Sequence, residues 1–216
     1  MGPFAPLRNR VDPFGNIHAV PARGLFTGNR GVIHDPASKT LLARRWTTKA
    51  WIVCTLEHPH GTRREPMGRN SPSGGAGWTE LFFLDEVTAL AAGHRPCFYC
   101  RRDAARDFRR FFARGNGLAT ATAPQIDSLL HAERHAVTGE KPPLQQDQIR
   151  QLPDGAAIAA KAEILALRAG LALPWSFSGY GEPRALPAHA RLLTPRSTIA
   201  ALRAGYAPAW HPSALP

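Results

Sequence analysis

The segment TELFFLDEVTALAAGHRPCFYCRR, residues 79–102, combines a short strand, a helix and a pair of cysteines. The apolar run Thr79–Leu84 predicts the strand. Asp85 is well placed to cap the following helix, because its carboxylate can accept hydrogen bonds from the first free backbone amides. Gly93 suits the left-handed position that ends a helix, and Pro96 prevents the helix from resuming.

The cysteine pair in this segment predicts a metal site. Cys97 and Cys100 stand three positions apart on a turn, so their thiolates can face one ion before the next helix begins. Zinc takes four ligands in a tetrahedron, and a second pair must come from elsewhere. Cys54 is the third and last cysteine, and His58 follows it by four residues, so these four are the simplest ligand set. The histidines His60, His34 and His94 compete with His58 for the fourth place.

The segment after the cysteine pair predicts a basic helix from about Cys100 to Arg114, which Gly115 and its neighbours end. Guanidinium groups bind phosphate bidentately, so the helix is the leading candidate surface for nucleic acid. Its candidate phosphate ligands are Arg101, Arg102, Arg106, Arg109, Arg110 and Arg114. The glycine-rich segment RGLFTGNRG, residues 23–31, adds Arg23 and Arg30. The alternative is a solvated helix face stabilised by Asp–Arg pairs.

Residues 82–102, FFLDEVTALAAGHRPCFYCRR, resemble the second half of the Ada-type metal-binding domain of DNA alkylation-repair proteins. That family binds zinc through four cysteines. The resemblance implies that Cys97 and Cys100 match its second cysteine pair and that Cys54 matches its first, methyl-accepting cysteine. His58 would replace the remaining cysteine. The resemblance also implies a connection with DNA and its repair.

The composition points to an acidic partner. Lys and Arg number 27 against 16 Asp and Glu, giving a formal net charge of +11. A basic excess of this size favours a polyanion, with DNA preferred over RNA here, although it also serves solubility. No apolar stretch approaches the roughly 18 residues of a membrane-spanning helix, and the first ten residues lack a secretory pattern. With so few cysteines, a reducing, cytoplasmic setting is expected.

A second polar cluster supports an alternative function. A helix is predicted from about Gln125 to His135, on which Asp127, His131 and His135 recur every four residues, with Glu133 to the side. Carboxylate and imidazole groups at this spacing can bind a metal or perform acid–base chemistry. The alternative is therefore a nucleic-acid-processing hydrolase or lyase, with the zinc site structural. A third hypothesis is a protein-interaction module that uses zinc only to fold.

These patterns together predict an α+β protein. We expect an extended arm over residues 1–23, a zinc-stabilised module with the basic helix over 24–115, a helical link over 116–152, and a mixed α/β portion over 153–216. Within the last portion, residues 155–173 fit a helix or a hairpin, and we favour strands. Thr194 is expected to cap a final helix, with Pro195 at its first position.

Overall fold

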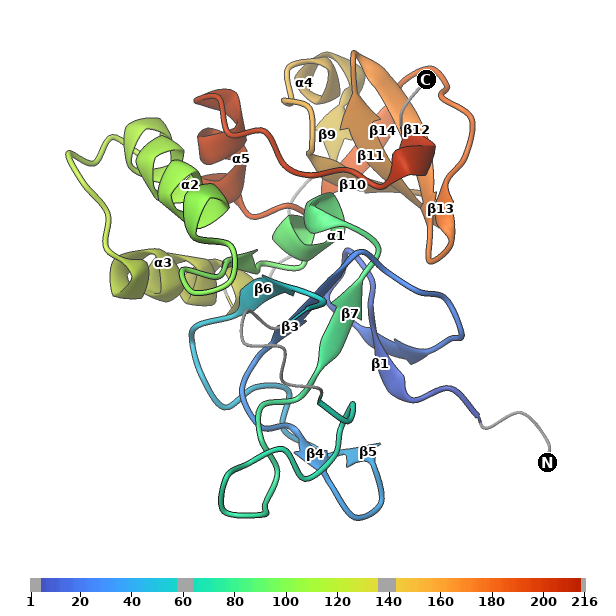
Figure 1. Cartoon of the computed structure of the whole chain (residues 1–216). Coiled ribbons are helices and arrows are strands. Elements are labelled where there is room, and N and C mark those ends of the chain that lie inside the picture. The colour runs from blue at the N-terminus through green and yellow to red at the C-terminus, as the bar shows by residue number, and fades with distance from the viewer. Residues whose placement is uncertain (1–4, 58–63, 136–142, 215–216) are drawn as a thin grey trace.

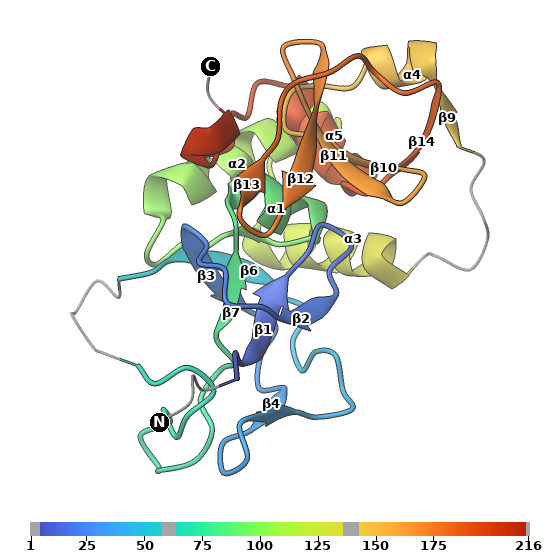
Figure 2. The same cartoon turned by 90° about the vertical axis from the view of Figure 1, so that its right-hand side faces the viewer.

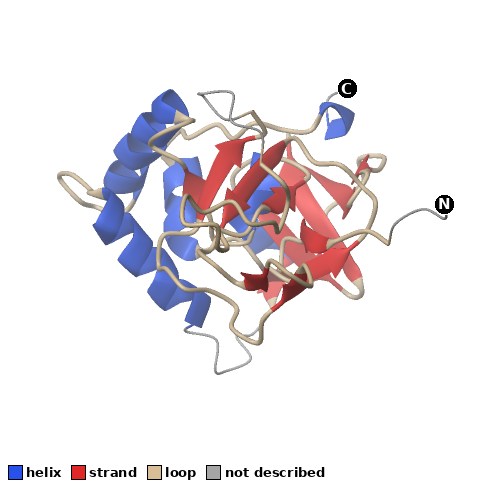
Figure 3. Cartoon of the chain, turned by 60° about the horizontal axis from the view of Figure 1, so that its bottom comes forward, coloured by secondary structure: helices blue, strands red, loops and turns tan. Residues whose placement is uncertain are grey.

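The computed structural model describes residues 5–57, 64–135 and 143–214 and contains both helices and sheets, which agrees with the predicted α+β class. Two six-stranded sheets lie at opposite ends of the molecule, and most of the helices pack to one side (Figure 1). Figure 3 shows the two longest helices together along that side. Along the described residues, every helix is too short or too polar to cross a membrane.

The N-terminal sheet has the strand order β2-β1-β7-β3-β6-β8. Its strands are β1 (Arg8–Val11), β2 (Ile17–Ala19), β3 (Phe26–Asn29), β6 (Ile52–Thr55), β7 (Leu81–Phe83) and β8 (Arg95–Pro96). A separate pair is formed by β4 (His34–Asp35) and β5 (Thr40–Leu41). The structure differs from the expected arm at β1 and β2, which join the sheet because Val11 is fully buried in its core.

The C-terminal sheet has the order β13-β12-β11-β10-β14-β9. Its strands are β9 (Leu144–Gln145), β10 (Ala157–Ala160), β11 (Glu163–Arg168), β12 (Leu171–Ser176), β13 (Gly179–Tyr180) and β14 (His189–Leu192). Strands β10, β11 and β12 pair antiparallel in sequence order. The preference for strands over a helix in residues 155–173 is thereby confirmed.

The helices are α1 (Glu86–Ala91), α2 (Arg102–Gly115), α3 (Ala123–His135), α4 (Gln146–Arg150) and α5 (Arg196–Arg203), with a 3-10 turn η1 (Pro212–Ala214). The predicted start of α1 is confirmed, since the Asp85 carboxylate accepts a hydrogen bond from the Thr88 amide at 2.9 Å. Gly93 has a φ of 78°, the left-handed conformation expected of a residue that follows a helix.

Helix α1 is the element that joins the two sheets, and all six of its residues are buried (Figures 1 and 2). Leu90 packs into the largest apolar cluster, formed by α2, α3, α5 and the C-terminal sheet. Ala89 packs into the smaller cluster of the N-terminal sheet. Val87 packs into a third cluster with the C-terminal segment. Helix α1, which lies within residues 79–102, therefore links the apolar clusters of the two sheets.

The start of α5 differs from the sequence expectation. The Thr194 hydroxyl accepts a hydrogen bond from the Ala157 amide at 2.8 Å, so it is occupied by strand β10 and does not cap the helix. A free backbone amide of the first turn is instead bound by Glu133 of α3, which accepts from the Ser197 amide at 3.0 Å and from its hydroxyl at 2.7 Å. A carboxylate is favoured there because it also faces the positive end of the helix dipole.

Candidate metal centre and basic helix

The three cysteines form one cluster, with their sulfur atoms all within 4.8 Å of one another. Cys54 and Cys97 are buried, and Cys100 is partly exposed. All three are free thiols. Among the described residues this is the one group of three or more His, Cys, Asp or Glu side chains that could hold a metal ion.

Strand pairing creates this cluster. Strands β6 and β8 run parallel with Val53 opposite Pro96, and the Cys97 amide donates to the Val53 carbonyl at 3.0 Å, which brings Cys97 beside Cys54. The chain then turns, with the Arg101 amide donating to the Cys97 carbonyl at 3.0 Å. This turn brings Cys100 back toward the other two sulfurs immediately before α2 begins.

The pKa values of Cys54 and Cys97 are shifted in opposite directions. Hydrogen bonds from Cys100 and then from Cys54 lower the pKa of Cys97 to about 2. The Tyr99 amide also donates to the Cys97 sulfur at 3.4 Å, and this further favours the thiolate. The pKa of Cys54 is raised, because its thiol is hydrogen-bonded to Cys100 and Cys97 and is also buried. The site thus favours at least one thiolate, the form of cysteine that binds metals.

The candidates for a fourth ligand fall into two groups. His58 and His60 lie outside the described residues. His34 and His94 are buried and bonded elsewhere, and neither belongs to the cysteine cluster. The His34 Nδ1 lies 2.7 Å from the Thr79 hydroxyl, and the His94 Nε2 accepts from the Arg30 Nε at 3.3 Å.

Helix α2 presents an exposed row of arginines directly after the cysteine cluster. Ala105, Phe108 and Phe112 are buried on its inner side. The exposed arginines of the helix are Arg102, Arg106, Arg109, Arg110 and Arg114. Because Arg102, Arg106 and Arg109 are spaced i, i+4, i+7, they lie on one face. Two of the five have carboxylate neighbours, Arg106 with Asp103 at 3.9 Å and Arg110 with Asp107 at 2.9 Å, and such exposed pairs contribute little.

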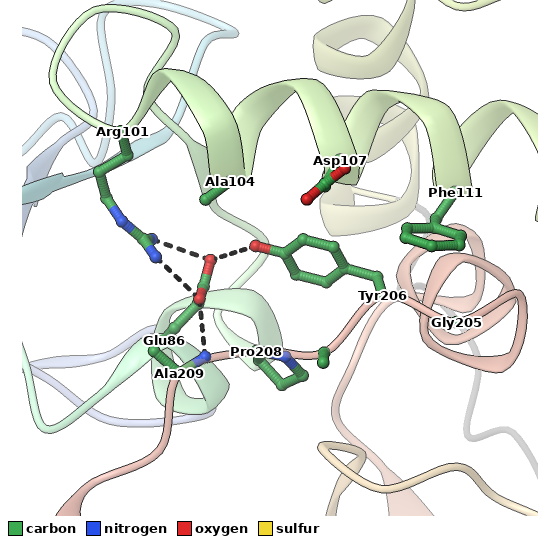
Figure 4. A pocket seen from close by; sticks show the side chains of 10 residues that line it. Glu86, Arg101, Ala104, Asp107, Phe111, Gly205, Tyr206, Pro208 and Ala209 are labelled. Carbon is green, nitrogen blue, oxygen red and sulfur yellow. Dashed lines mark hydrogen bonds and ion pairs between the residues drawn. The ribbon is translucent and has the colours of Figure 1, made fainter.

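Arg101 does not belong to this exposed row. Its guanidinium forms a bidentate ion pair with Glu86 at 2.8 and 2.9 Å, and its side chain is 9% exposed. Glu86 also accepts from the Tyr206 hydroxyl at 2.6 Å and from the Ala209 amide at 2.8 Å (Figure 4). These contacts line a surface depression of about 410 Å³ between α2 and the C-terminal segment. Arg101 therefore holds the helix in place, and a phosphate would have to displace Glu86 to reach it.

The two arginines of the glycine-rich segment also differ from each other. Arg23 is exposed, but Arg30 is completely buried, with its Nη1 donating to the Gly15 carbonyl at 2.9 Å. A phosphate at the surface of the protein would reach Arg30 only if the side chains that cover it moved aside. The burial follows from β3, which carries Arg30 inward immediately after its last residue, Asn29.

The polar residues of α3 do not come together as one catalytic group. Asp127 forms a buried bidentate pair with Arg95, with both distances 2.8 Å, and Glu133 caps α5 as described above. His131 and His135 do lie side by side, with ring centroids 4.5 Å apart, and both contact Trp46. The carboxylates expected to assist them are therefore occupied by structural contacts.

The sequence did not predict the buried ion pair between Arg95 and Asp127 or the contacts of Glu86 with Arg101 and Tyr206. Arg95 and Glu86 belong to the quoted segment, but nothing near them in the chain indicates Asp127 or Tyr206 as partners. Comparison of the chain with protein-family models, with curated proteins and with solved structures gave no match.

Proposed function

We propose that this chain is a zinc-containing nucleic-acid-binding protein, in which the cysteine cluster binds zinc and the exposed arginines of α2 bind the phosphate backbone. The observation that carries the proposal is the position of Cys100, which belongs to the cluster and stands two residues before the exposed arginine face begins. An ion bound at the cluster would fix the first turn of α2 to the edge of the N-terminal sheet. The exposed face of α2 that carries Arg102, Arg106 and Arg109, here called the arginine face, would then be held in a fixed orientation relative to that sheet.

The donor set fits zinc. A tetrahedral site with sulfur at about 2.3 Å from the ion places its sulfurs about 3.8 Å apart. The sulfurs of Cys54, Cys97 and Cys100 all lie within 4.8 Å of one another, so one ion could bind all three with little movement of their side chains. Thiolate-rich sites of this kind select zinc among the common divalent ions. His58 remains the proposed fourth ligand, with His60 as the competitor.

The arginine face fits a phosphate backbone. Arg102, Arg106 and Arg109 lie along about 10 Å of helix, on the basis of a rise of 1.5 Å per residue. Their planar donors suit phosphate oxygens, and backbone contacts of this type position a protein without reading base sequence. DNA is proposed ahead of RNA on the resemblance of residues 82–102, which is also what suggests a role in repair. Methyl acceptance at Cys54 would require the site to open, because that residue is only 8% exposed.

The catalytic alternative receives less support. Asp127 and Glu133 would have to leave Arg95 and Ser197 before either could assist His131 or His135. Moving a buried carboxylate away from its arginine would leave an uncompensated charge in the interior. We therefore propose a binding protein that needs no catalytic group.

The metal part of the proposal is tested by elemental analysis. We expect one zinc per chain in the protein purified without added metal, and less than a tenth of that in Cys97→Ser. His58→Ala and His60→Ala are compared in parallel, and the variant that lowers zinc affinity identifies the fourth ligand. A wild-type protein that neither carries nor takes up zinc would overturn this part.

The binding part is tested by fluorescence anisotropy with labelled duplex DNA, single-stranded DNA and RNA at several salt concentrations. Removing three phosphate contacts in the triple variant Arg102→Gln, Arg106→Gln, Arg109→Gln should reduce the slope of log K against log salt by about 3. The matched control Arg150→Gln, Lys161→Gln, Arg184→Gln removes the same charge from exposed positions in the C-terminal half. Equal losses in both variants would indicate nonspecific charge attraction and contradict the proposal.

A further inference from the structure

A second group of cations surrounds Trp51, and it shares no residue with the arginine face of α2. The Arg30 guanidinium lies 3.9 Å from the Trp51 ring centroid, and the Arg134 guanidinium lies 4.2 Å from it. Arg134 reaches the ring from the end of α3, held by its hydrogen bonds to the Gly93 carbonyl at 2.6 Å and the Lys49 carbonyl at 2.8 Å.

This cluster carries positive charge without a matching carboxylate. Among the ion pairs of the described residues, none includes Arg30 or Arg134. The acidic groups close enough to act on them electrostatically are occupied: Asp12 by His18, Asp127 by Arg95 and Glu133 by Ser197.

The cations of the cluster also disfavour one another. Burial, followed by the charges of Arg45 and Arg134, lowers the pKa of Arg30 to about 9. Burial lowers the pKa of Arg134 to about 10. Contact with an aromatic face offsets only part of the cost of burying a guanidinium, because a cation–π contact is weaker than the hydration that the ion loses.

Two donors of the cluster have no acceptor among the described residues. They are the Nη2 of Arg30, whose side chain is fully buried, and the Nε of Arg134. A buried donor without an acceptor destabilises the folded state, more so when it carries charge, and such groups are therefore rare in folded proteins. An anion with several oxygen atoms that reached these donors would supply the missing acceptors and offset the positive charge.

Arg45 gives this cluster a way to receive a ligand. Its side chain is exposed, and it lies close enough to affect the pKa of Arg30. Its side chain is held only loosely, by a contact of 3.5 Å to the Asn16 side-chain oxygen. Arg45 is therefore free to reorient and to contribute its own donors to an anion beside Arg30.

We propose that Arg30, Arg45 and Arg134 form a binding site for a phosphate group beside Trp51. Planar guanidinium groups bind phosphate through paired hydrogen bonds, and three of them suit a dianion. The phosphate belongs to a small phosphomonoester, to free phosphate or to the end of a nucleic-acid strand, which present the same chemistry. The site is independent of zinc and of the arginine face of α2.

The test is calorimetric titration of the full chain with inorganic phosphate, with ionic strength held constant by chloride. We expect saturable binding to one site, weakened about tenfold or more in Arg134→Gln and in Arg45→Gln, since each variant removes a charged hydrogen-bond donor from the phosphate. The matched control is Arg168→Gln, because Arg168 also lies against a tryptophan, Trp210, and donates to a carbonyl, but it is far from the cluster in the sequence and shares none of its contacts.

The outcomes separate this proposal from the one above. The triple variant of α2 should bind phosphate as the wild type does, even if nucleic-acid binding fails. A 5′-phosphorylated oligonucleotide that binds more tightly than its unphosphorylated form, with the difference lost in Arg134→Gln, identifies a strand end; equal binding of the two leaves a small phosphate ligand. If Arg134→Gln does not fold, as judged by circular dichroism, the exposed Arg45→Gln decides. Absence of saturable phosphate binding in the wild type, or unchanged binding in the folded variants, would overturn the proposal.

Discussion

The two sheets of this molecule are stabilised in different ways. The C-terminal sheet rests on the largest apolar cluster, which includes Phe108, Phe112, Ile158 and Leu165 and takes in residues from α1, α2, α3, α4 and α5. The N-terminal sheet has a much smaller apolar cluster around Val53, Leu81 and Phe83. Guanidinium–aromatic contacts surround that smaller cluster, including those of Arg10 with Phe82, Arg64 with Trp78 and Arg101 with Phe26.

The difference shows what each half of the chain requires in order to stay folded. Burial of apolar surface contributes about 25 cal/mol per Å², so the C-terminal half can be held mainly by its core. The N-terminal half buries less apolar surface and more charge, and charged contacts offset much of their own gain through desolvation. The proposed metal would supply what the smaller core lacks.

Removal of the metal should have the largest effect and should separate the two halves. Structural zinc contributes about 10–16 kcal/mol in small zinc domains, because the site forms only in the folded state. With a strong chelator we expect amide exchange in β6, β8 and the first turn of α2 to become at least 100-fold faster, while β10, β11 and β12 keep most of their protection. Hydrogen-exchange mass spectrometry measures both regions in one sample. Cys97→Ser serves as the control, since chelator should have no further effect on it, and an unchanged wild type would contradict the comparison.

Matched leucine truncations should give a smaller effect that sharpens the contrast. Leu165 and Leu81 are both buried on central strands, one in each sheet. We expect Leu165→Ala to cost about 4 kcal/mol and Leu81→Ala about 2–3 kcal/mol in the metal-saturated protein, because a larger core leaves a cavity that collapses less. Denaturant unfolding followed by circular dichroism gives both values. Equal costs would mean that the two cores are equally well packed.

Local signals in the sequence predicted several of the elements and the cysteine cluster, although they missed the strands β1 and β2. The cap at Asp85, the end of α1 at Gly93 and the strands of residues 155–173 all depend on neighbours within a few positions, which the sequence displays directly. The three cysteines were identified because cysteine is rare in this chain, and the pairing of β6 with β8 confirms that they meet.

Contacts between distant residues account for what could not be predicted. Thr194 is a residue type that often caps helices, but its hydroxyl accepts a hydrogen bond from the Ala157 amide of strand β10. The Ser197 amide of the helix is bound instead by Glu133, which is 64 positions away from it in the sequence. Arg30 stands in a glycine-rich segment typical of an exposed loop, yet the sheet carries it into the interior. In each case tertiary packing decided between two locally acceptable roles, and no local pattern records that choice.

Acid should weaken the N-terminal half in particular, through His94. Burial, followed by the charges of Arg30 and Arg134, holds the pKa of His94 well below 6.5. The folded state therefore keeps this ring neutral while the unfolded chain protonates it, so the stability is present above pH 6.5 and is lost as the pH falls below that value. One such proton lowers the free energy of unfolding by about 1.4 kcal/mol per pH unit. In His94→Gln, the free energy of unfolding should therefore fall by about 1 kcal/mol less between pH 7 and 5.5, since the unfolded histidine is only partly protonated near pH 6.5. Denaturant unfolding measures this difference, with zinc occupancy checked at each pH. Equal slopes in the two proteins would mean that His94 titrates normally and that its buried, cationic surroundings do not control its charge.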